Sequence, residues 1–164
     1  MLMLEDSQQI EIQAKADRIY SYLEEQSTKF PLGFLDYRPF FVMRLILIGE
    51  PARAMRVLFK GKSFGNSEGE KLRLAVGDNY GPFCLIEAVP GQKYFFRLRT
   101  SVKLFDLETG YLMFPGEKNT LLRFDLLAHD PSLIQRAYWK IVKPFHQVLT
   151  RRVLRIIKKR MESA

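Results

Sequence analysis

The chain has 164 residues, of which 47% are hydrophobic and 27% are charged, and its formal net charge is +8. A chain of this length can bury one hydrophobic core without disulfides or metal ions. Because Cys84 is the only cysteine, an intrachain disulfide is excluded and a reducing, cytoplasmic location is favoured. The two histidines, His129 and His146, belong to no cluster with metal-ligand spacing, so we expect neither a metal ion nor a cofactor.

The sequence predicts no cleaved leader and no membrane span. Its first six residues lack the basic start of a secretory signal. The longest apolar run, Phe40 to Ile48, is interrupted by Arg44 and is shorter than the ~20 residues that a spanning helix needs. Any membrane association is therefore expected to be peripheral.

A strand followed by a short helix is predicted at the start of the chain. Residues 8–15 alternate between apolar and polar side chains, with Ile10, Ile12 and Ala14 on the side expected to be buried. The next apolar residues take helical spacing, which places them on one helix face: Ala16, Ile19, Tyr20 and Leu23.

The segment from Pro39 to Phe59 is predicted to be helical in one or two pieces, with a break near Gly49 to Pro51. The following residues, 61–70, are polar and rich in glycine. They contain Gly61-Lys62-Ser63, but this triplet does not stand at the P-loop position and lacks the strand–turn–helix context of a phosphate-binding loop, so the segment predicts a flexible connection.

From residue 71 onward the pattern changes to strands separated by turns, with no helix between them. This pattern predicts an antiparallel meander. The predicted strands are Leu72 to Val76, Phe83 to Val89, Lys93 to Val102, Thr109 to Phe114 and Asn119 to His129.

One face of the meander is expected to be apolar and the other charged. The apolar face would carry Tyr94, Phe96, Leu98, Thr100, Tyr111, Met113, Leu122, Phe124 and Leu126. The charged face would carry Arg97, Arg99, Arg123 and Asp125, which suits water. An arginine at position 97 or 99 would pair with Asp125 across the strands.

Residues from Asp130 to Met161 predict one long amphipathic helix, with Asp130 and Ser132 as candidate capping residues at its N-terminus. Three-and-four spacing predicts a buried face of Ile134, Tyr138, Ile141, Phe145, Val148, Leu149 and Ile156. The opposite face would carry Arg136, Lys140, Lys143, Arg151, Arg155 and Lys158. Together the elements predict an α+β fold, in which a curved antiparallel sheet wraps the apolar side of the last helix around a space lined by aromatics and methionine.

The sequence resembles the SRPBCC superfamily, the START-related, birch-pollen-allergen-like helix-grip proteins. Within it, the chain is similar to an uncharacterised family that is often fused behind NAD-dependent-epimerase-like domains. The resemblance covers roughly residues 38 to 160. It is carried by Val76-Gly77-Asp78, by Ile86-Glu87-Ala88-Val89 with Pro90-Gly91, and by the run from Tyr138-Trp139 to Pro144-Phe145-His146. It implies a single helix-grip domain over residues 1–164.

The superfamily resemblance implies a deep apolar cavity that binds lipids, sterols, polyketides or other hydrophobic molecules. The sequence therefore predicts a binding or carrier module for a hydrophobic small molecule or lipid. Candidate ligand-binding residues are Tyr80, Tyr94, Phe96, Leu98, Tyr111, Met113, Phe124, Tyr138, Ile141 and Phe145.

A cyclase- or hydrolase-type enzyme that uses the same cavity is the alternative, because the superfamily includes both carriers and enzymes. Its participants would be Tyr80, His146 and Asp78. The inward positions carry aromatic side chains rather than a converging set of titratable groups, so binding is favoured and no catalytic residue is assigned.

Basic residues near the end of the chain suggest a further partner, an anionic membrane surface. The candidate contacts are Arg151, Arg152, Arg155, Lys158 and Lys159. Nucleic-acid binding is the weakest hypothesis, because no nucleic-acid-binding motif accompanies the charge. The sequence does not predict an oligomeric state.

Overall fold

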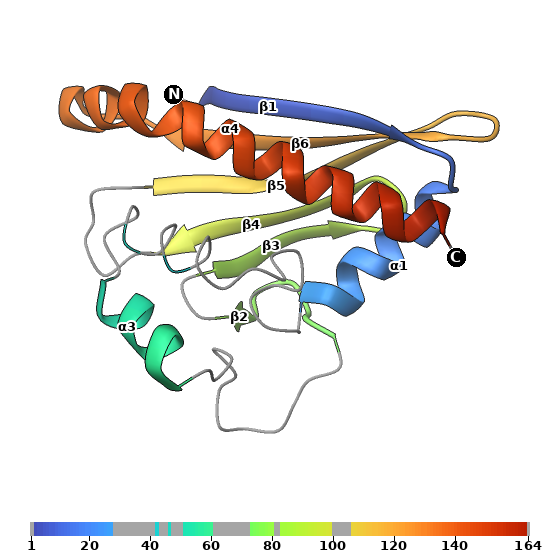
Figure 1. The fold of residues 1–164 in the computed structure, drawn as a ribbon, viewed down its shortest axis with the longest axis horizontal. Coiled ribbons are helices and arrows are strands. Elements are labelled where there is room, and N and C mark those ends of the chain that lie inside the picture. The colour runs from blue at the N-terminus through green and yellow to red at the C-terminus, as the bar shows by residue number, and fades with distance from the viewer. Residues whose placement is uncertain are drawn as a thin grey trace.

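The computed structural model describes residues 2–27, 42, 46, 51–60, 73–80, 83–99 and 106–163. They form the α+β, helix-grip fold that the sequence predicts: a curved, six-stranded antiparallel sheet with a long C-terminal helix across it (Figure 1). The strand order is β1-β6-β5-β4-β3-β2, which places the first strand of the chain beside the last one.

The N-terminal strand β1 (Leu2–Ile12) begins six residues earlier than predicted and pairs with β6 from Leu2 opposite His129 to Ile12 opposite Thr120. Its register shifts between Leu4 and Asp6. Helix α1 (Ala16–Ser27) follows, and its four apolar positions are buried as predicted: Ala16, Ile19, Tyr20 and Leu23.

Helix α3 (Pro51–Lys60) confirms the second part of the helix predicted between Pro39 and Phe59. Val42 and Ile46 are also helical, whereas the rest of that prediction and the connection over residues 61–70 lie outside the described residues.

The meander is confirmed over β3 (Phe83–Val89), β4 (Lys93–Arg99), β5 (Asp106–Pro115) and β6 (Thr120–His129), each antiparallel to the next. The predicted strand from Leu72 to Val76 is wrong over its described residues 73–76, which form no strand. A tight turn forms there instead, because the Asp78 carboxylate accepts a hydrogen bond from the Ala75 amide at 2.9 Å. Gly77 supplies the positive φ of 96° that this turn needs. The adjoining strand, β2 (Asn79–Tyr80), is only two residues long.

The last helix, α4 (Leu133–Glu162), is a single element of 30 residues with Pro144 inside it. Ser132 is its N-cap, and the Ser132 hydroxyl accepts a hydrogen bond from the Gln135 amide at 3.2 Å. The helix runs alongside β1, where Arg151 donates to the Gln8 side chain and Lys158 donates to the Glu11 carbonyl.

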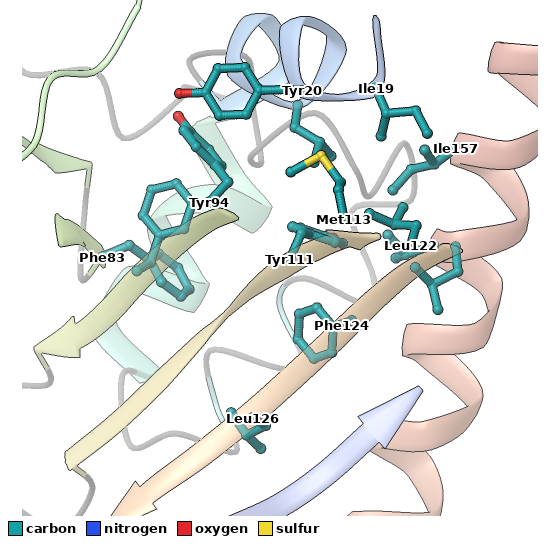
Figure 2. Close-up of a cluster of buried hydrophobic side chains, with 14 of the residues drawn as sticks. Ile19, Tyr20, Phe83, Tyr94, Tyr111, Met113, Leu122, Phe124, Leu126 and Ile157 are labelled. Carbon is teal, nitrogen blue, oxygen red and sulfur yellow. The ribbon is translucent and has the colours of Figure 1, made fainter. Parts of the chain in front are cut away.

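The core lies between the inner face of the sheet, α1 and the C-terminal half of α4 (Figure 2). Alternate residues of β4, β5 and β6 point inward as predicted. Tyr94, Phe96, Leu98, Tyr111, Met113, Leu122, Phe124 and Leu126 are all buried, whereas Thr100 lies outside the described residues. Edge-on ring contacts join Tyr20 to Tyr94 and Tyr94 to Phe96, with centroids 5.7 and 5.1 Å apart.

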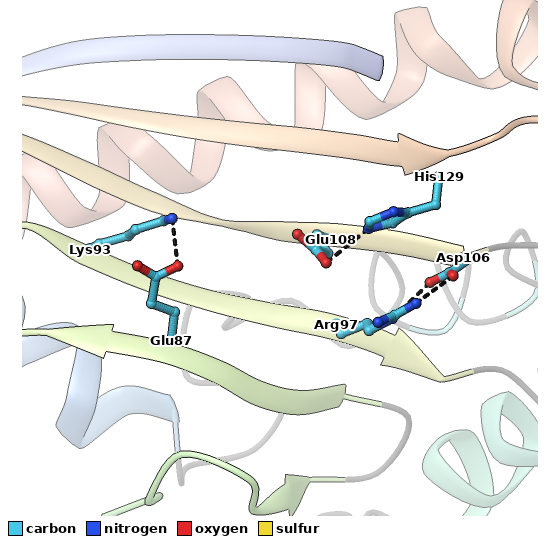
Figure 3. Close-up of polar contacts among 6 residues, drawn as sticks. All are labelled: Glu87, Lys93, Arg97, Asp106, Glu108 and His129. Atoms are coloured by element: carbon cyan, nitrogen blue, oxygen red, sulfur yellow. Dashed lines mark hydrogen bonds and ion pairs between the residues drawn. The ribbon is translucent and has the colours of Figure 1, made fainter. Parts of the chain in front are cut away.

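The outer face of the sheet carries ion pairs between neighbouring strands (Figure 3). Arg97 forms a bidentate pair with Asp106, with N–O distances of 2.9 and 2.6 Å, and the His129 Nε2 lies 2.8 Å from Glu108. The predicted pairing of Arg97 or Arg99 with Asp125 is therefore wrong for Arg97. Asp125 is buried rather than solvated, since Ser7 and Arg123 both donate hydrogen bonds to its carboxylate.

Candidate functional site

The structure brings together the predicted inner-face residues of the sheet. Tyr94, Phe96 and Leu98 come from β4, Tyr111 and Met113 from β5, and Phe124 from β6. Register explains the grouping, because Tyr94, Tyr111 and Phe124 lie side by side on three neighbouring strands. Their role in ligand binding remains a prediction.

The two ends of this inner face differ. At one end α1 and the last turns of α4 close the core, and Ile12, Ile19, Leu122 and Ile157 are at most 1% exposed (Figure 2). The other end lies where β6 leads into α4, and we call it the α4-start end. Its inward residues are Leu98, Leu107, Thr109, Leu126 and Ala128.

Two buried polar atoms at the α4-start end lack partners. The Thr109 hydroxyl and the Gln135 side-chain nitrogen have no hydrogen-bond partner in the described part of the chain, although both residues are more than 90% buried. Thr109 has the inward parity of Tyr111 and Met113, so its position was recoverable from the alternation of β5. Gln135 gave no such signal.

The predicted buried face of α4 is wrong in its N-terminal half. Ile134, Ile141, Phe145 and Val148 are 60–74% exposed. Ile141 and Phe145, two of the candidate ligand residues, therefore point away from the sheet. The third candidate on this helix, Tyr138, is half-buried, and burial raises its pKa to about 12.

The residues that α4 buries change character along the helix. The buried residues of its first half and middle are mostly polar, and those of its last turns are apolar. The buried set is Gln135, Val142, His146, Thr150, Val153, Leu154, Ile157 and Met161. The buried face of α4 is thus mostly polar in its first half and apolar in its last turns. The outward face is apolar in the first half and basic in the second half.

A buried polar network joins α4 to β1. The His146 Nδ1 lies 3.0 Å from one Asp6 carboxylate oxygen, and Gln147 donates to the other at 3.1 Å. Asp6 is 4% exposed, and burial alone raises the pKa of its carboxyl group. Hydrogen bonds to His146, Gln147 and Gln8 outweigh that effect and lower the pKa below its ordinary value.

Asp6 was not among the residues predicted from the sequence, and His146 was considered there only as a participant in the enzyme hypothesis. The available signal was parity, since Asp6 shares the inward side of β1 with Gln8, Ile10 and Ile12.

The structure does not bring together the residues of the enzyme hypothesis. His146 contacts β1 at one edge of the sheet, whereas Asp78 and Tyr80 adjoin or belong to β2 at the other edge. The Asp78 carboxylate already accepts the Ala75 amide, and the Tyr80 side chain lies outside the described residues. Cys84 is buried, with its sulfur 3.7 Å from the Gly77 carbonyl oxygen.

The five basic candidates for an anionic surface all lie on the second half of α4. Arg151 and Lys158 face β1, where they donate to Gln8 and Glu11. The other three are exposed: Arg152, Arg155 and Lys159. Whether any of them contacts a membrane remains a prediction.

Within the described ranges, no three His, Cys, Asp or Glu side chains gather to hold a metal ion. Over the same part of the chain, no helix combines the length and the apolar character that crossing a membrane requires.

Comparison with known proteins shows the fold alone. No family model matches the chain, and no curated protein matches it. A solved protein from Nitrosospira multiformis is similar in structure, with a TM-score of 0.55 and 12% sequence identity over 95% of this chain and 94% of the other.

Two other solved structures were also found. A protein from Mesorhizobium loti has a TM-score of 0.48 and 11% identity, over 94% of this chain and 98% of that one. An AHSA1-like protein from Rhizobium etli has a TM-score of 0.44 and 10% identity, over 96% and 83% of the two chains.

Proposed function

We propose that the protein binds a hydrophobic small molecule or lipid between the inner face of the sheet and α4, as a binding or carrier module. The observation that carries this proposal is the unpartnered Thr109 hydroxyl, which lies among aromatic and aliphatic side chains. A buried polar group without a hydrogen bond costs about 1–3 kcal/mol. A ligand that supplies the missing partner would recover this free energy.

The chemistry of the site favours a ligand with an apolar body and an oxygen acceptor. The surrounding inward residues, Phe96, Leu98, Leu107 and Leu126, are apolar and suit a hydrocarbon or ring system. The Thr109 hydroxyl and the Gln135 amide nitrogen can both donate hydrogen bonds. A carboxylate or carbonyl oxygen on the ligand would supply the acceptor that either donor lacks. The resemblance to the SRPBCC superfamily supports the same class of ligand.

Catalysis is the weaker interpretation. Among the described inward side chains, the two groups suited to acid–base chemistry are Asp6 and His146, which are bonded to each other at the β1 edge. Asp78, the third polar participant considered from sequence, holds a turn at the opposite edge. We therefore propose binding without assigning a catalytic residue.

The test begins with native mass spectrometry of the gently purified protein, followed by solvent extraction and identification of any bound molecule. Binding is then titrated with an anthroyloxy-labelled fatty acid. The variant Thr109→Val keeps the shape of the side chain and removes the hydroxyl. We expect it to weaken binding of the probe about three- to tenfold and to stabilise the ligand-free protein by about 1 kcal/mol.

Thr120→Val is the matched control, because the buried Thr120 hydroxyl already donates to the Ala14 carbonyl at 2.7 Å. This substitution should lower stability by about 1–2 kcal/mol and leave affinity for the probe unchanged. The proposal is wrong if the wild-type protein neither retains a hydrophobic molecule nor binds the probe, or if the two variants weaken binding equally.

A further inference from the structure

The exposed face of the N-terminal half of α4 is unusually apolar. Five large apolar side chains there are 60–82% exposed, and we call them the apolar stripe: Leu133, Ile134, Ile141, Phe145 and Val148. Single exposed hydrophobic residues are ordinary on a protein surface. These five are different because they share one side of one helix over about four turns, at a rise of ~1.5 Å per residue.

Basic residues continue the same side of the helix. At ~100° per residue, positions 152, 155 and 159 fall in the sector that the five positions of the apolar stripe occupy. Arg152, Arg155 and Lys159 are all exposed there. The outward face of α4 is therefore apolar over its first half and cationic over its second half.

The net charge of the whole chain resides on this helix. Residues 133–162 contain nine lysines and arginines and one acidic residue, Glu162, a net charge of +8 that equals the net charge of all 164 residues. Acidic and basic residues are balanced in number over the remaining positions. A partner attracted by charge would therefore approach the protein on α4.

We propose that the outward face of α4 docks the protein on anionic phospholipid bilayers. The apolar stripe enters the boundary between headgroups and acyl chains, and Arg152, Arg155 and Lys159 lie against lipid phosphates. An anionic bilayer offers an apolar layer beneath a negatively charged one, which matches a helix that is apolar and cationic on one face. This inference is independent of the ligand proposed above.

The test is flotation of the protein with vesicles of phosphatidylcholine and phosphatidylserine, 70:30, against vesicles of phosphatidylcholine alone. We expect binding to the anionic vesicles only, and weaker binding when NaCl is raised from 0.1 to 0.5 M. The paired change Ile141→Gln and Phe145→Gln should reduce binding at least about tenfold. The triple change Arg152→Gln, Arg155→Gln and Lys159→Gln should reduce it by a similar factor or more.

Matched control variants test whether the loss of binding depends on where the substituted residues lie or only on their residue type. Met55 and Phe59 are exposed apolar residues on α3, so Met55→Gln with Phe59→Gln removes the same kind of side chain away from the stripe. Lys15, Arg18 and Lys118 are exposed basic residues outside α4, so their change to Gln removes three charges elsewhere. We expect both control proteins to bind anionic vesicles within about twofold of the wild type.

Because all the substituted residues are exposed, every variant should keep the circular dichroism spectrum and unfolding midpoint of the wild type. When a polarity-sensitive fluorophore is attached to the variant Ile141→Cys, its emission should shift to the blue on anionic vesicles, while the same label on Val76→Cys should not shift. Failure of the wild-type protein to float with anionic vesicles would overturn the proposal. So would equal losses in the stripe variant and its control. Sedimentation that shows a dimer broken by the stripe variant, with vesicle binding unchanged, would instead assign the stripe to self-association.

Discussion

Asp6 and His146 tie the first strand to the last helix across 140 positions of sequence. Both side chains are buried, so their hydrogen bond is not simply a gain in free energy. Removing a charge from water costs free energy, which offsets much of the attraction within a buried pair. Deleting one partner is nevertheless strongly destabilising, because it leaves the other partner buried without its hydrogen bond. Gln147 and Gln8 complete the hydrogen bonding around the Asp6 carboxylate, which is why the charged form is held despite burial.

We expect Asp6→Ala to lower the free energy of unfolding at pH 7 by about 3 kcal/mol, because it leaves His146 buried without its acceptor. The dependence on pH has a definite sign. The pKa of Asp6 is lower in the folded protein than in the unfolded chain, where it is about 3.9. Its stabilising contribution is therefore complete above that unfolded value and is lost as pH falls through the folded value.

The measurement is urea unfolding of the wild type and of Asp6→Asn between pH 7 and pH 2.5. The difference in stability between the two proteins should be constant at neutral pH and should shrink below about pH 4. A difference that stays constant over the whole range, or that grows in acid, would show that Asp6 has no lowered pKa in the folded state.

At the level of elements, the sheet was predictable and the orientation of α4 was not. The residues that point into the core repeat every second position along β4, β5 and β6, so Tyr94, Phe96, Tyr111 and Phe124 could be assigned from alternation alone. The buried positions of α1 could be predicted in the same way, from their helical spacing. The inward parity of Thr109 was also readable, but parity does not reveal that a hydroxyl lacks a partner.

The predicted orientation of α4 is wrong for a physical reason. Periodicity identifies the most apolar side of a helix, and burial of that side is an additional assumption. Beside α4, β1 presents the carboxylate of Asp6 rather than an apolar side chain, so the helix turns His146 toward it. Ile141 and Phe145 then point outward. The strand predicted at residues 72–76 failed because Asp78 hydrogen-bonds its own turn, a local competitor that the alternation pattern does not reveal.

The change of buried face along α4 can be tested with two identical substitutions. Ile157 is 1% exposed and Ile141 is 71% exposed. Ile157→Ala should cost about 2–5 kcal/mol of stability because it leaves a cavity in the core. Ile141→Ala should change stability by at most about 0.5 kcal/mol. Urea unfolding of both variants provides the measurement, and equal losses would show that Ile141 is buried in solution.

At the scale of the whole molecule, stability should be greatest at the centre of the sheet. β5 and β6 each have a neighbouring strand on both sides and a buried inner face, whereas β2 is a two-residue edge strand. We expect the amides of Tyr111, Leu122 and Phe124 to exchange with solvent at least about a hundredfold more slowly than those of Asn79 and Tyr80. Native-state hydrogen exchange followed by NMR would measure this, and similar rates in both regions would contradict the expectation.

Charge is distributed unevenly at the same scale. The sheet pairs its charges on the outer face, as with Arg97 and Asp106 or Glu87 and Lys93, so this face has little net field. The net charge of +8 on α4 is not offset within the helix, which contains one acidic residue, Glu162. The protein is thus a nearly neutral body with one cationic edge, and its long-range electrostatic interactions are expected to be those of α4.

The pairing of Leu2 with His129 has a practical consequence for labelled proteins. It brings the start of β1 to within four residues of the beginning of α4, while the other end of the helix leads directly to the C-terminus (Figure 1). A fluorescent protein fused to the N-terminus would therefore lie beside the first half of α4 and obstruct the apolar stripe. A fusion after Glu162 would lie about 45 Å away along the helix. Localisation studies with the two fusions should therefore disagree if the outward face of α4 is the contact surface.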